Sequence, residues 1–253
     1  MMIGMRRLTV LGMMSLMIFV HAGAQASEAA REYLEGIQLY NQGHYEKAAT
    51  LFETVAEKGV INGKLYYNAG NAWFKEGNIG RAMLWYERAL NIMPHDPDLR
   101  YNHDYVTGLL KDKSEDKTSP VFKVLFFWKE MLNKNIIRWL ALGFFLIFWV
   151  RVVIGMLNSG RSMKLIDWLF LSLALVFTFT SFNDFYNARF NEHAIVLVES
   201  VSVRSGLTEE STELFVLHSG TRVGVDDELR GYVKIRFSDD KIGWIKREDI
   251  EII

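Results

Sequence analysis

A period of 34 residues in the first half of the chain constrains the fold most. The residues that return after this period are Gly36, Gly43, Ala48 and Phe52, answered by Gly70, Gly77, Ala82 and Tyr86. A period of this length, with small residues at fixed offsets, is typical of stacked helix–turn–helix units. The period therefore predicts an α-helical repeat array, a class of fold that binds other proteins.

The small residues have separate structural roles in this prediction. Gly43 interrupts a helical pattern and suits a turn with positive φ, which glycine adopts without strain. Gly36 and Gly70 are expected where one helix approaches its partner closely. Pro94 ends the second unit, because proline cannot continue a helix.

Two units are few for a continuous core, since stacked repeats generally need about three. We therefore expect a closing helix over residues 98–111. Its apolar positions are Leu99, Tyr101, Tyr105 and Leu109.

The second unit resembles the tetratricopeptide repeat family. The matching residues are Gly70, Trp73, Gly77, Ala82, Tyr86, Ala89 and Pro94, and in the first unit Gly36, Gly43, Tyr45, Ala48 and Phe52. The first unit departs from the pattern at Val60, where proline is usual, and at Glu32, where an aromatic residue is common. The resemblance implies repeats at residues 29–62 and 63–96 within a domain at residues 28–112.

In that family the first helix of each unit lines a protein-binding groove. The resemblance implies a groove formed by Tyr33, Ile37, Tyr40, Asn41, Lys64, Tyr67, Asn71, Phe74 and Lys75. Asn71 and Asn102 stand as in repeats that clamp a terminal carboxylate, but Tyr33 and Tyr67 occupy positions where that clamp has lysine. A general protein-binding groove is the favoured interpretation.

Half of the residues are hydrophobic, and they cluster in three long runs. The first run, at residues 8–20, follows Arg6 and Arg7 and precedes several small residues. This pattern predicts a secretory signal peptide over residues 1–26, with an uncleaved signal anchor as the alternative. Both interpretations place the repeats outside the cytoplasm.

The other two runs predict a membrane hairpin. Residues 136–157 and 165–182 approach the roughly 20 residues that a helix needs to cross a bilayer. The alternative is a pair of buried helices in a soluble core. The short link between the runs predicts that both flanking domains lie on one side. We also expect Arg151 and Asp167 to form an intramembrane pair. Residues 113–134 are predicted as a linker followed by an interfacial amphipathic helix.

From residue 193 the pattern changes to a period of two. Short alternating segments between turn residues predict a small all-β barrel over residues 193–253. The sequences around Val203, Ser219 and Trp244 resemble bacterial SH3-like domains. That resemblance implies binding of cell-wall peptides or proteins. Tyr232 and Trp244 either line a shallow SH3-like groove or pack the barrel.

Several function classes find no support in the sequence. The net charge of −1 argues against a nucleic-acid-binding protein, which would carry a basic face. Cysteine is absent, which excludes disulfides and thiol catalysis. Phosphate-binding and serine-hydrolase motifs are also missing. We therefore predict no catalytic residues, no cofactor and no metal. The nearest approach to a metal cluster is His95, Asp96, His103 and Asp104, where helix capping by Asp96 or Asp98 is the favoured interpretation.

The fold class predicted for the whole chain is a multi-domain membrane protein: an all-α tetratricopeptide repeat array, a two-helix transmembrane hairpin and an all-β SH3-like barrel. This order resembles the Bacteroides aerotolerance (Bat) group. The resemblance implies an inner-membrane component that acts with von Willebrand factor A-domain membrane proteins and a MoxR-type ATPase, with a link to oxygen or stress tolerance. The leading hypothesis is a non-enzymatic scaffold on the periplasmic side, and the alternative is a sensor that binds peptidoglycan.

Overall fold

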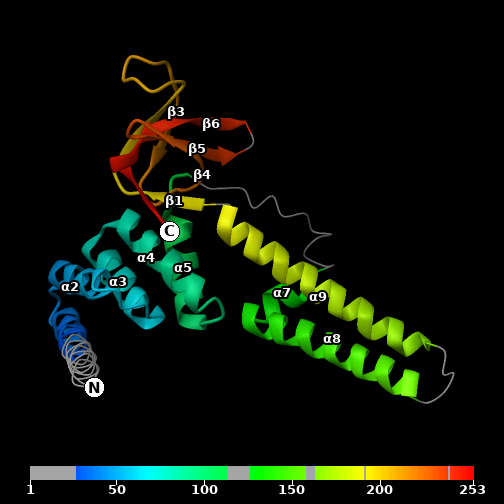
Figure 1. Cartoon of the computed structure of the whole chain (residues 1–253). Helices are drawn as coiled ribbons and strands as arrows, with labels where there is room; N and C mark the ends of the chain where they lie inside the picture. The colour runs from blue at the N-terminus through cyan, green and yellow to red at the C-terminus, as the bar shows by residue number, and fades with distance from the viewer. Residues whose placement is uncertain (1–26, 113–125, 158–162, 191, 239) are drawn as a thin grey trace, which may run out of the picture.

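Three parts make up the described molecule: a helical array, a hairpin of two long apolar helices and an antiparallel β domain (Figure 1). The computed structural model describes residues 27–112, 126–157, 163–190, 192–238 and 240–253. The three-part architecture predicted from the sequence is confirmed. The predicted signal peptide and most of the linker before the hairpin lie outside the described residues.

The array repeats its helices and its helix ends with the predicted period. Its helices are residues 27–41, α2 (Tyr45–Glu57), α3 (Gly63–Glu76), α4 (Ile79–Ile92) and α5 (Pro97–Leu109). Gly43 and Gly77 occupy equivalent turns with φ of 82° and 89°. Asn62 caps α3 and Asp96, one period later, caps α5 through side-chain oxygens. Such caps satisfy the first N–H groups of a helix.

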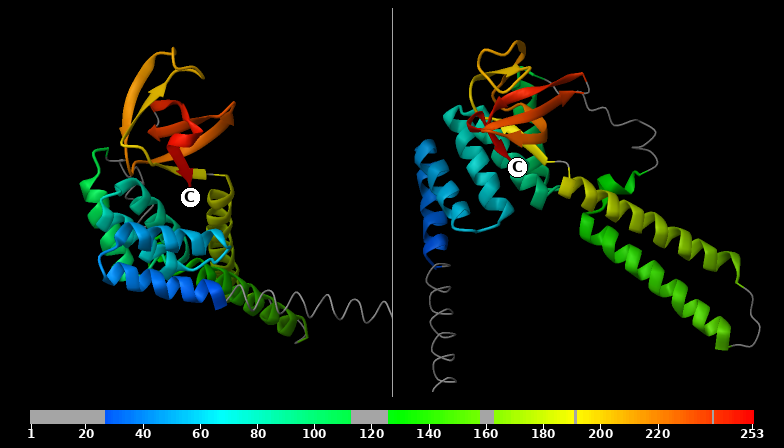
Figure 2. Two further views of the ribbon diagram at one scale, coloured as in Figure 1. Left: turned by 90° about the vertical axis from the view of Figure 1, so that its left-hand side faces the viewer. Right: turned by 45° about the horizontal axis from the view of Figure 1, so that its top comes forward.

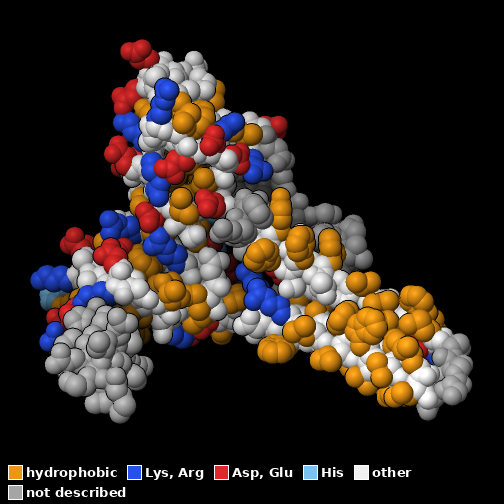
Figure 3. All heavy atoms as spheres, viewed as in Figure 1, with side chains coloured by type: hydrophobic (Ala, Val, Ile, Leu, Met, Phe, Trp, Pro, Cys, Tyr) orange, Lys and Arg blue, Asp and Glu red, His pale blue; other side chains and the backbone are white. Residues whose placement is uncertain are grey.

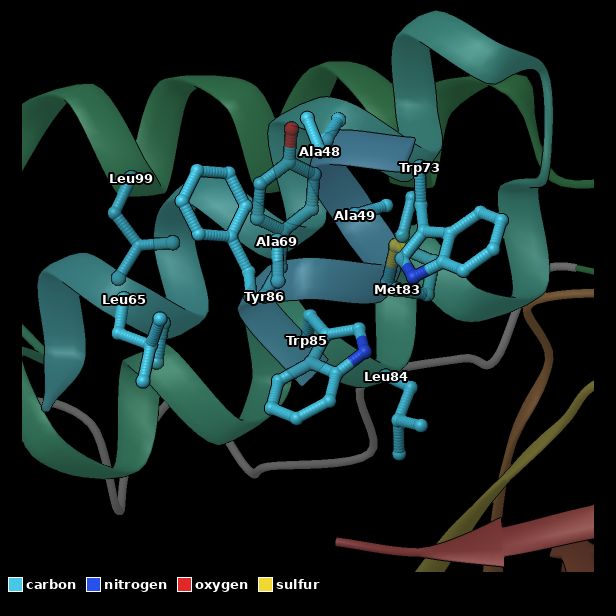
Figure 4. Packing of buried hydrophobic residues seen from close by; sticks show 14 of the residues in the cluster. Ala48, Ala49, Leu65, Ala69, Trp73, Met83, Leu84, Trp85, Tyr86 and Leu99 are labelled. Atoms are coloured by element: carbon cyan, nitrogen blue, oxygen red, sulfur yellow. The ribbon is translucent and has the colours of Figure 1, made fainter. Parts of the chain in front are cut away.

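Close helix approach explains the repeated glycines. A Cβ at Gly36 would lie 2.6 Å from the ring of Phe52, and one at Gly70 would lie 2.6 Å from the ring of Tyr86. Tyr86 is fully buried and packs with Leu65 and Leu99 in the array core (Figure 4). The expected role of the small residues is therefore confirmed.

The hairpin consists of α8 (Lys134–Leu157) and α9 (Leu165–Phe190), with the short α7 (Trp128–Met131) before it. Both helices are long and apolar enough to cross a membrane. Only 11% of the most apolar stretch of α8 and 17% of that of α9 is buried. Hydrophobic side chains cover the surface of the hairpin (Figure 3). A soluble core would bury such helices, so this exposure favours a membrane protein.

The β domain is a single antiparallel sheet in the order β3-β2-β6-β5-β4-β1-β7. Its strands are β1 (Glu192–Val196), β2 (Ser200–Arg204), β3 (Glu213–His218), β4 (Arg222–Leu229), β5 (Tyr232–Ser238), β6 (Lys241–Lys246) and β7 (Ile250–Ile252). The sheet is open in its hydrogen bonding, with β3 and β7 at its two ends. The all-β domain predicted from the alternating segments is confirmed.

The β domain packs directly on the repeat array (Figure 2). Ile195 is buried in the core of the array, and Leu197 packs against the same core. Glycines allow the close approach: a Cβ at Gly80 on α4 would lie 2.9 Å from the carbonyl oxygen of Val196, and one at Gly220 would lie 2.6 Å from Leu110. The two domains therefore share an interface built from both.

A candidate protein-binding face

Tyrosines on the first helices of successive units form a ladder that follows the repeat. Asn68 Nδ2 donates to the Tyr33 hydroxyl at 2.9 Å, and Asn102 Nδ2 donates to the Tyr67 hydroxyl at 3.0 Å. Each bond joins one unit to the next and spans 35 residues. The hydrogen bonds fix the tyrosine rings in a row along the first helices of the units.

The two predicted clamp asparagines bond within the array. Asn71 Oδ1 accepts hydrogen bonds from the Tyr86 hydroxyl at 2.7 Å and from Asn102 Nδ2 at 2.9 Å. Burial raises the pKa of Tyr86 above its ordinary value, so this hydroxyl stays a donor. These amides therefore hold neighbouring helices together, an arrangement unlike that of a carboxylate clamp.

The remaining predicted groove residues divide into apolar and charged positions. Ile37 is half-buried against the core, and Tyr40 meets the Tyr45 ring edge-on at 5.2 Å. Asn41 and Lys75 are exposed. Lys64 is also exposed, and its Nζ pairs with Asp96 at 2.8 Å. The hydrogen bond with Asp96 raises the pKa of Lys64, and the Asp96 carboxylate offsets the charge of the lysine.

The closing helix α5 presents three of its four predicted apolar positions to solvent. Tyr101, Tyr105 and Leu109 are 72%, 54% and 53% exposed, whereas Leu99 and Val106 are buried. The sequence predicted Tyr101, Tyr105 and Leu109 as apolar positions of a closing helix, and no described helix covers that side of α5. The Tyr105 ring lies 5.8 Å from Phe74 in an edge-on contact, so these exposed positions continue the predicted groove.

These residues form what we call the aromatic face: Tyr33, Tyr40, Tyr67, Phe74, Tyr101 and Tyr105. The repeat itself indicates that Tyr101 belongs to it, because Tyr33, Tyr67 and Tyr101 are spaced by 34 residues. The sequence prediction placed Tyr101 among the apolar positions of the closing helix and did not connect it with the groove.

The predicted membrane pair is brought together in the hairpin. Arg151 Nε on α8 donates to Asp167 Oδ1 on α9 at 2.5 Å, and the backbone N–H of Lys164 donates to Asp167 Oδ2 at 2.8 Å. A second ion pair, Lys129 with Asp184 at 2.6 Å, ties α7 to the opposite end of α9. The two pairs fix the register of the hairpin near both of its ends.

Tyr232 and Trp244 lie on the same face of the β5–β6 hairpin. In the register of β5 and β6, Tyr232 lies opposite Lys246 and Lys234 lies opposite Trp244. Paired residues point to one side of a sheet. The buried residues Val233 and Ile245 alternate with them and form the β-domain core. The structure therefore places both aromatic side chains on the face opposite that core.

The histidine and aspartate cluster near α5 is engaged in local contacts. Asp96 Oδ1 accepts from the backbone N–H of Leu99 at 3.1 Å as a helix cap, and Lys64 binds its other oxygen. His103 Nε2 lies 3.0 Å from Glu87 Oε1 on α4. Among the residues that the structure describes, no group of three potential ligands is arranged to hold a metal ion.

Stacked helix–turn–helix units with a period of 34 residues define a helical repeat protein whose fold is suited to protein–protein interaction. The family model for the tetratricopeptide repeat matches residues 63–96, which are the second unit described above. No curated protein matches the chain.

Proposed function

We propose that this protein is a membrane-anchored, non-enzymatic scaffold that binds protein partners through the aromatic face. The observation that carries this proposal is the exposed stripe of Tyr101, Tyr105 and Leu109, which adjoins Phe74. Contiguous exposed apolar surface of this kind marks interaction sites. Tyrosine suits such a surface because its ring is apolar and its hydroxyl remains solvated.

The resemblance to the Bat group suggests where the scaffold acts. We place the repeats and the β domain on the periplasmic side of a bacterial inner membrane, anchored by α8 and α9. The partners would be von Willebrand factor A-domain membrane proteins and a MoxR-type ATPase system, in an envelope complex linked to oxygen or stress tolerance. The support for this assignment is the order of the parts in the chain.

Photocrosslinking from the aromatic face tests the proposal. A benzoylphenylalanine at position 105 should crosslink to a membrane protein partner in intact cells. The double variant Tyr101→Ser/Tyr105→Ser should lower recovery of that partner by about tenfold, since buried aromatic anchors dominate interfaces. Arg100→Ala, on another side of α5, is the matched control and should leave recovery unchanged.

The unmodified protein, the double variant and Arg100→Ala should have the same melting temperature. If all three then recover the same amount of the partner, the proposal is contradicted. A benzoylphenylalanine at position 100 that crosslinks, while one at position 105 does not, would place the interface on another side of α5 and would also contradict it.

A cell-wall sensor is the second candidate function. The outward-facing, partly exposed pair Tyr232 and Trp244 favours it, since aromatic rings on the face of a sheet can stack on a ligand. Cosedimentation of the full chain in detergent with purified peptidoglycan measures this function. Binding that is lost in Trp244→Ala supports the sensor, and no cosedimentation above an empty-detergent control argues against it.

A further inference from the structure

Two cavities adjoin at Leu197 and Glu251, one lined by the β domain alone and the other lying between the repeats and the β domain. Their volumes are about 520 and 440 Å³, and both are lined by Leu197 and Glu251. One cavity extends to Tyr232 at the end of the β5–β6 hairpin, and the other to Trp85 on α4. Each volume is in the range of ligand-binding sites. We call this feature the seam groove, and it is separate from the aromatic face.

The seam groove follows the free edge of β7. This strand is the last in the sheet order and pairs on one side with β1. The backbone N–H of Ile253 donates to His193 and that of Leu197 donates to Asp249, so residues 249 and 253 face β1. Residues alternate in direction along a strand, so the N–H and C=O groups of Ile250 and Ile252 point outward.

Two arginine side chains donate hydrogen bonds to the outward-pointing carbonyl oxygens of β7. Arg247 Nη1 donates to the carbonyl oxygen of Ile250 at 3.0 Å, and Arg88 Nη2 donates to that of Ile252 at 2.9 Å. The same two arginines line the two cavities, one in each. The groove therefore lies on the side where an added strand would form its hydrogen bonds.

The arginines also define the chemistry of the occupant. Arg88 pairs with Glu251 at 2.9 Å, and Arg247 lies 3.8 Å from Glu228. These pairs are partly exposed, and exposed ion pairs contribute little to stability. A ligand that supplies backbone N–H groups to the carbonyls and carboxylates to the guanidiniums replaces the bonds that the two arginines make. The carboxylates of Glu251 and Glu228 that it releases are partly exposed and can be solvated.

We propose that the seam groove binds an extended, acidic segment of a partner protein, which adds to the edge of β7 as an eighth strand. Main-chain hydrogen bonds to a sheet edge give such complexes their affinity. Carboxylates on the side of Arg88 and Arg247 give selectivity for acidic segments. Leu197, which lines both cavities, offers apolar surface to the alternating apolar side chains.

The test uses the full chain in detergent and a fluorescein-labelled hexapeptide, Asp-Val-Asp-Val-Asp-Val, with binding followed by fluorescence anisotropy. Ile252→Pro removes one outward N–H and leaves the bonds to β1 intact, since proline is tolerated at a strand edge. Ile252→Ala is the matched control, because it loses the same side-chain packing and keeps the N–H. We expect Ile252→Pro to weaken binding at least about tenfold and Ile252→Ala by less than about threefold.

Two further peptides separate strand addition from charge attraction. The same peptide N-methylated at every residue keeps its carboxylates but loses all of its backbone N–H donors, and we expect it not to bind. The Lys-Val analogue keeps the backbone but reverses the charge, and we expect weaker binding.

Equal binding of the N-methylated peptide, equal binding to Ile252→Pro or no binding to the unmodified chain would each overturn strand addition. Equal binding of the Lys-Val peptide would overturn the preference for acidic segments.

Discussion

A single missing side chain at Gly70 sets the spacing between α3 and α4. A Cβ there would lie 2.6 Å from two atoms of the Tyr86 ring, and Tyr86 is fully buried. The ring cannot move aside without disturbing its hydrogen bond to Asn71. Gly108, on α5, is also helical, but a Cβ there would meet nothing within 4 Å.

These two glycines predict opposite effects of the same substitution. Gly70→Ala should destabilise the chain by about 1–3 kcal/mol, because overpacking forces the helices apart. Gly108→Ala should be neutral or stabilising by up to about 1 kcal/mol, because alanine favours a helix. Thermal unfolding of both full-length variants in detergent, followed by circular dichroism, measures the difference. A Gly70→Ala variant that melts with or above the unmodified protein would contradict the packing argument.

Glu87 is a charged residue at the domain interface and is 8% exposed. His103 lies 3.0 Å from one carboxylate oxygen and Arg222 lies 3.5 Å from the other. Burial alone would raise the pKa of Glu87, but the hydrogen bond with His103 and the charge of Arg222 outweigh it and lower the pKa. Burial alone would lower the pKa of His103, but the bond with Glu87 raises it above 6.5.

The two shifts predict a window of pH in which Glu87 stabilises the interface. A lowered carboxyl pKa gives stability that is present above 4.5 and is lost as the pH falls through the lowered value. A raised histidine pKa gives stability that is present below 6.5 and is lost as the pH rises through the raised value. The melting temperature of the unmodified chain should therefore exceed that of Glu87→Gln most between these limits. If the difference in melting temperature between the unmodified chain and Glu87→Gln stays constant from about pH 4 to pH 8, the pKa shifts of Glu87 and His103 do not stabilise the interface.

At the scale of elements, one carboxylate joins three helices of the array. Glu53 on α2 accepts from the indole nitrogens of Trp73 on α3 and Trp85 on α4, at 2.8 and 2.7 Å. Arg81 donates to its second oxygen at 3.0 Å. The side chain of Glu53 is 17% exposed, so water cannot easily replace it as acceptor.

Glu53→Leu should destabilise the array by about 2–4 kcal/mol, because it leaves two indole donors without their acceptor. Glu53→Gln keeps the oxygen that accepts from both indoles and should cost about 1 kcal/mol. Chemical denaturation of both full-length variants gives these free energies. Equal losses for the two variants would show that the charge of Glu53, rather than its hydrogen bonding, stabilises the array.

The elements that the sequence predicted well are those whose signals are local. Gly43 and Gly77 mark turns because positive φ is a property of one residue, and Gly36 and Gly70 mark close approach because the period repeats it. The exposed side of α5 was not predictable in this way. Periodicity identifies the apolar stripe of Tyr101 and Tyr105, but only the arrangement of neighbouring elements decides whether another helix covers it.

At the scale of the whole molecule, the domain interface depends on contacts between distant segments. Asp112 at the end of the array accepts from the backbone N–H of His218 at 2.6 Å and from the Thr221 hydroxyl at 2.8 Å. These bonds span 106 and 109 residues. No periodicity or motif connects such positions, so neither the residues that form the interface nor the seam groove was predicted from the sequence.

The same contacts constrain how the chain is placed in a membrane. Domains that share buried side chains cannot lie on opposite sides of a bilayer. The hairpin of α8 and α9 separates the repeats from the β domain in the sequence, so both long helices must cross, or neither does.

Cysteine labelling of intact cells tests this topology cleanly, because the chain contains no cysteine. Single cysteines at exposed Gln42 in the repeats and Arg230 in the β domain report on the two domains. Both should react with a membrane-impermeant maleimide to the same extent, and Ala194→Cys, fully buried in the β-domain core, should react only after denaturation. Protection of both exposed sites in intact cells, with labelling after lysis, would keep the shared side but place it in the cytoplasm. Labelling of one site and protection of the other would rule out the interface between the domains, since Asp112 and His218 could then never meet.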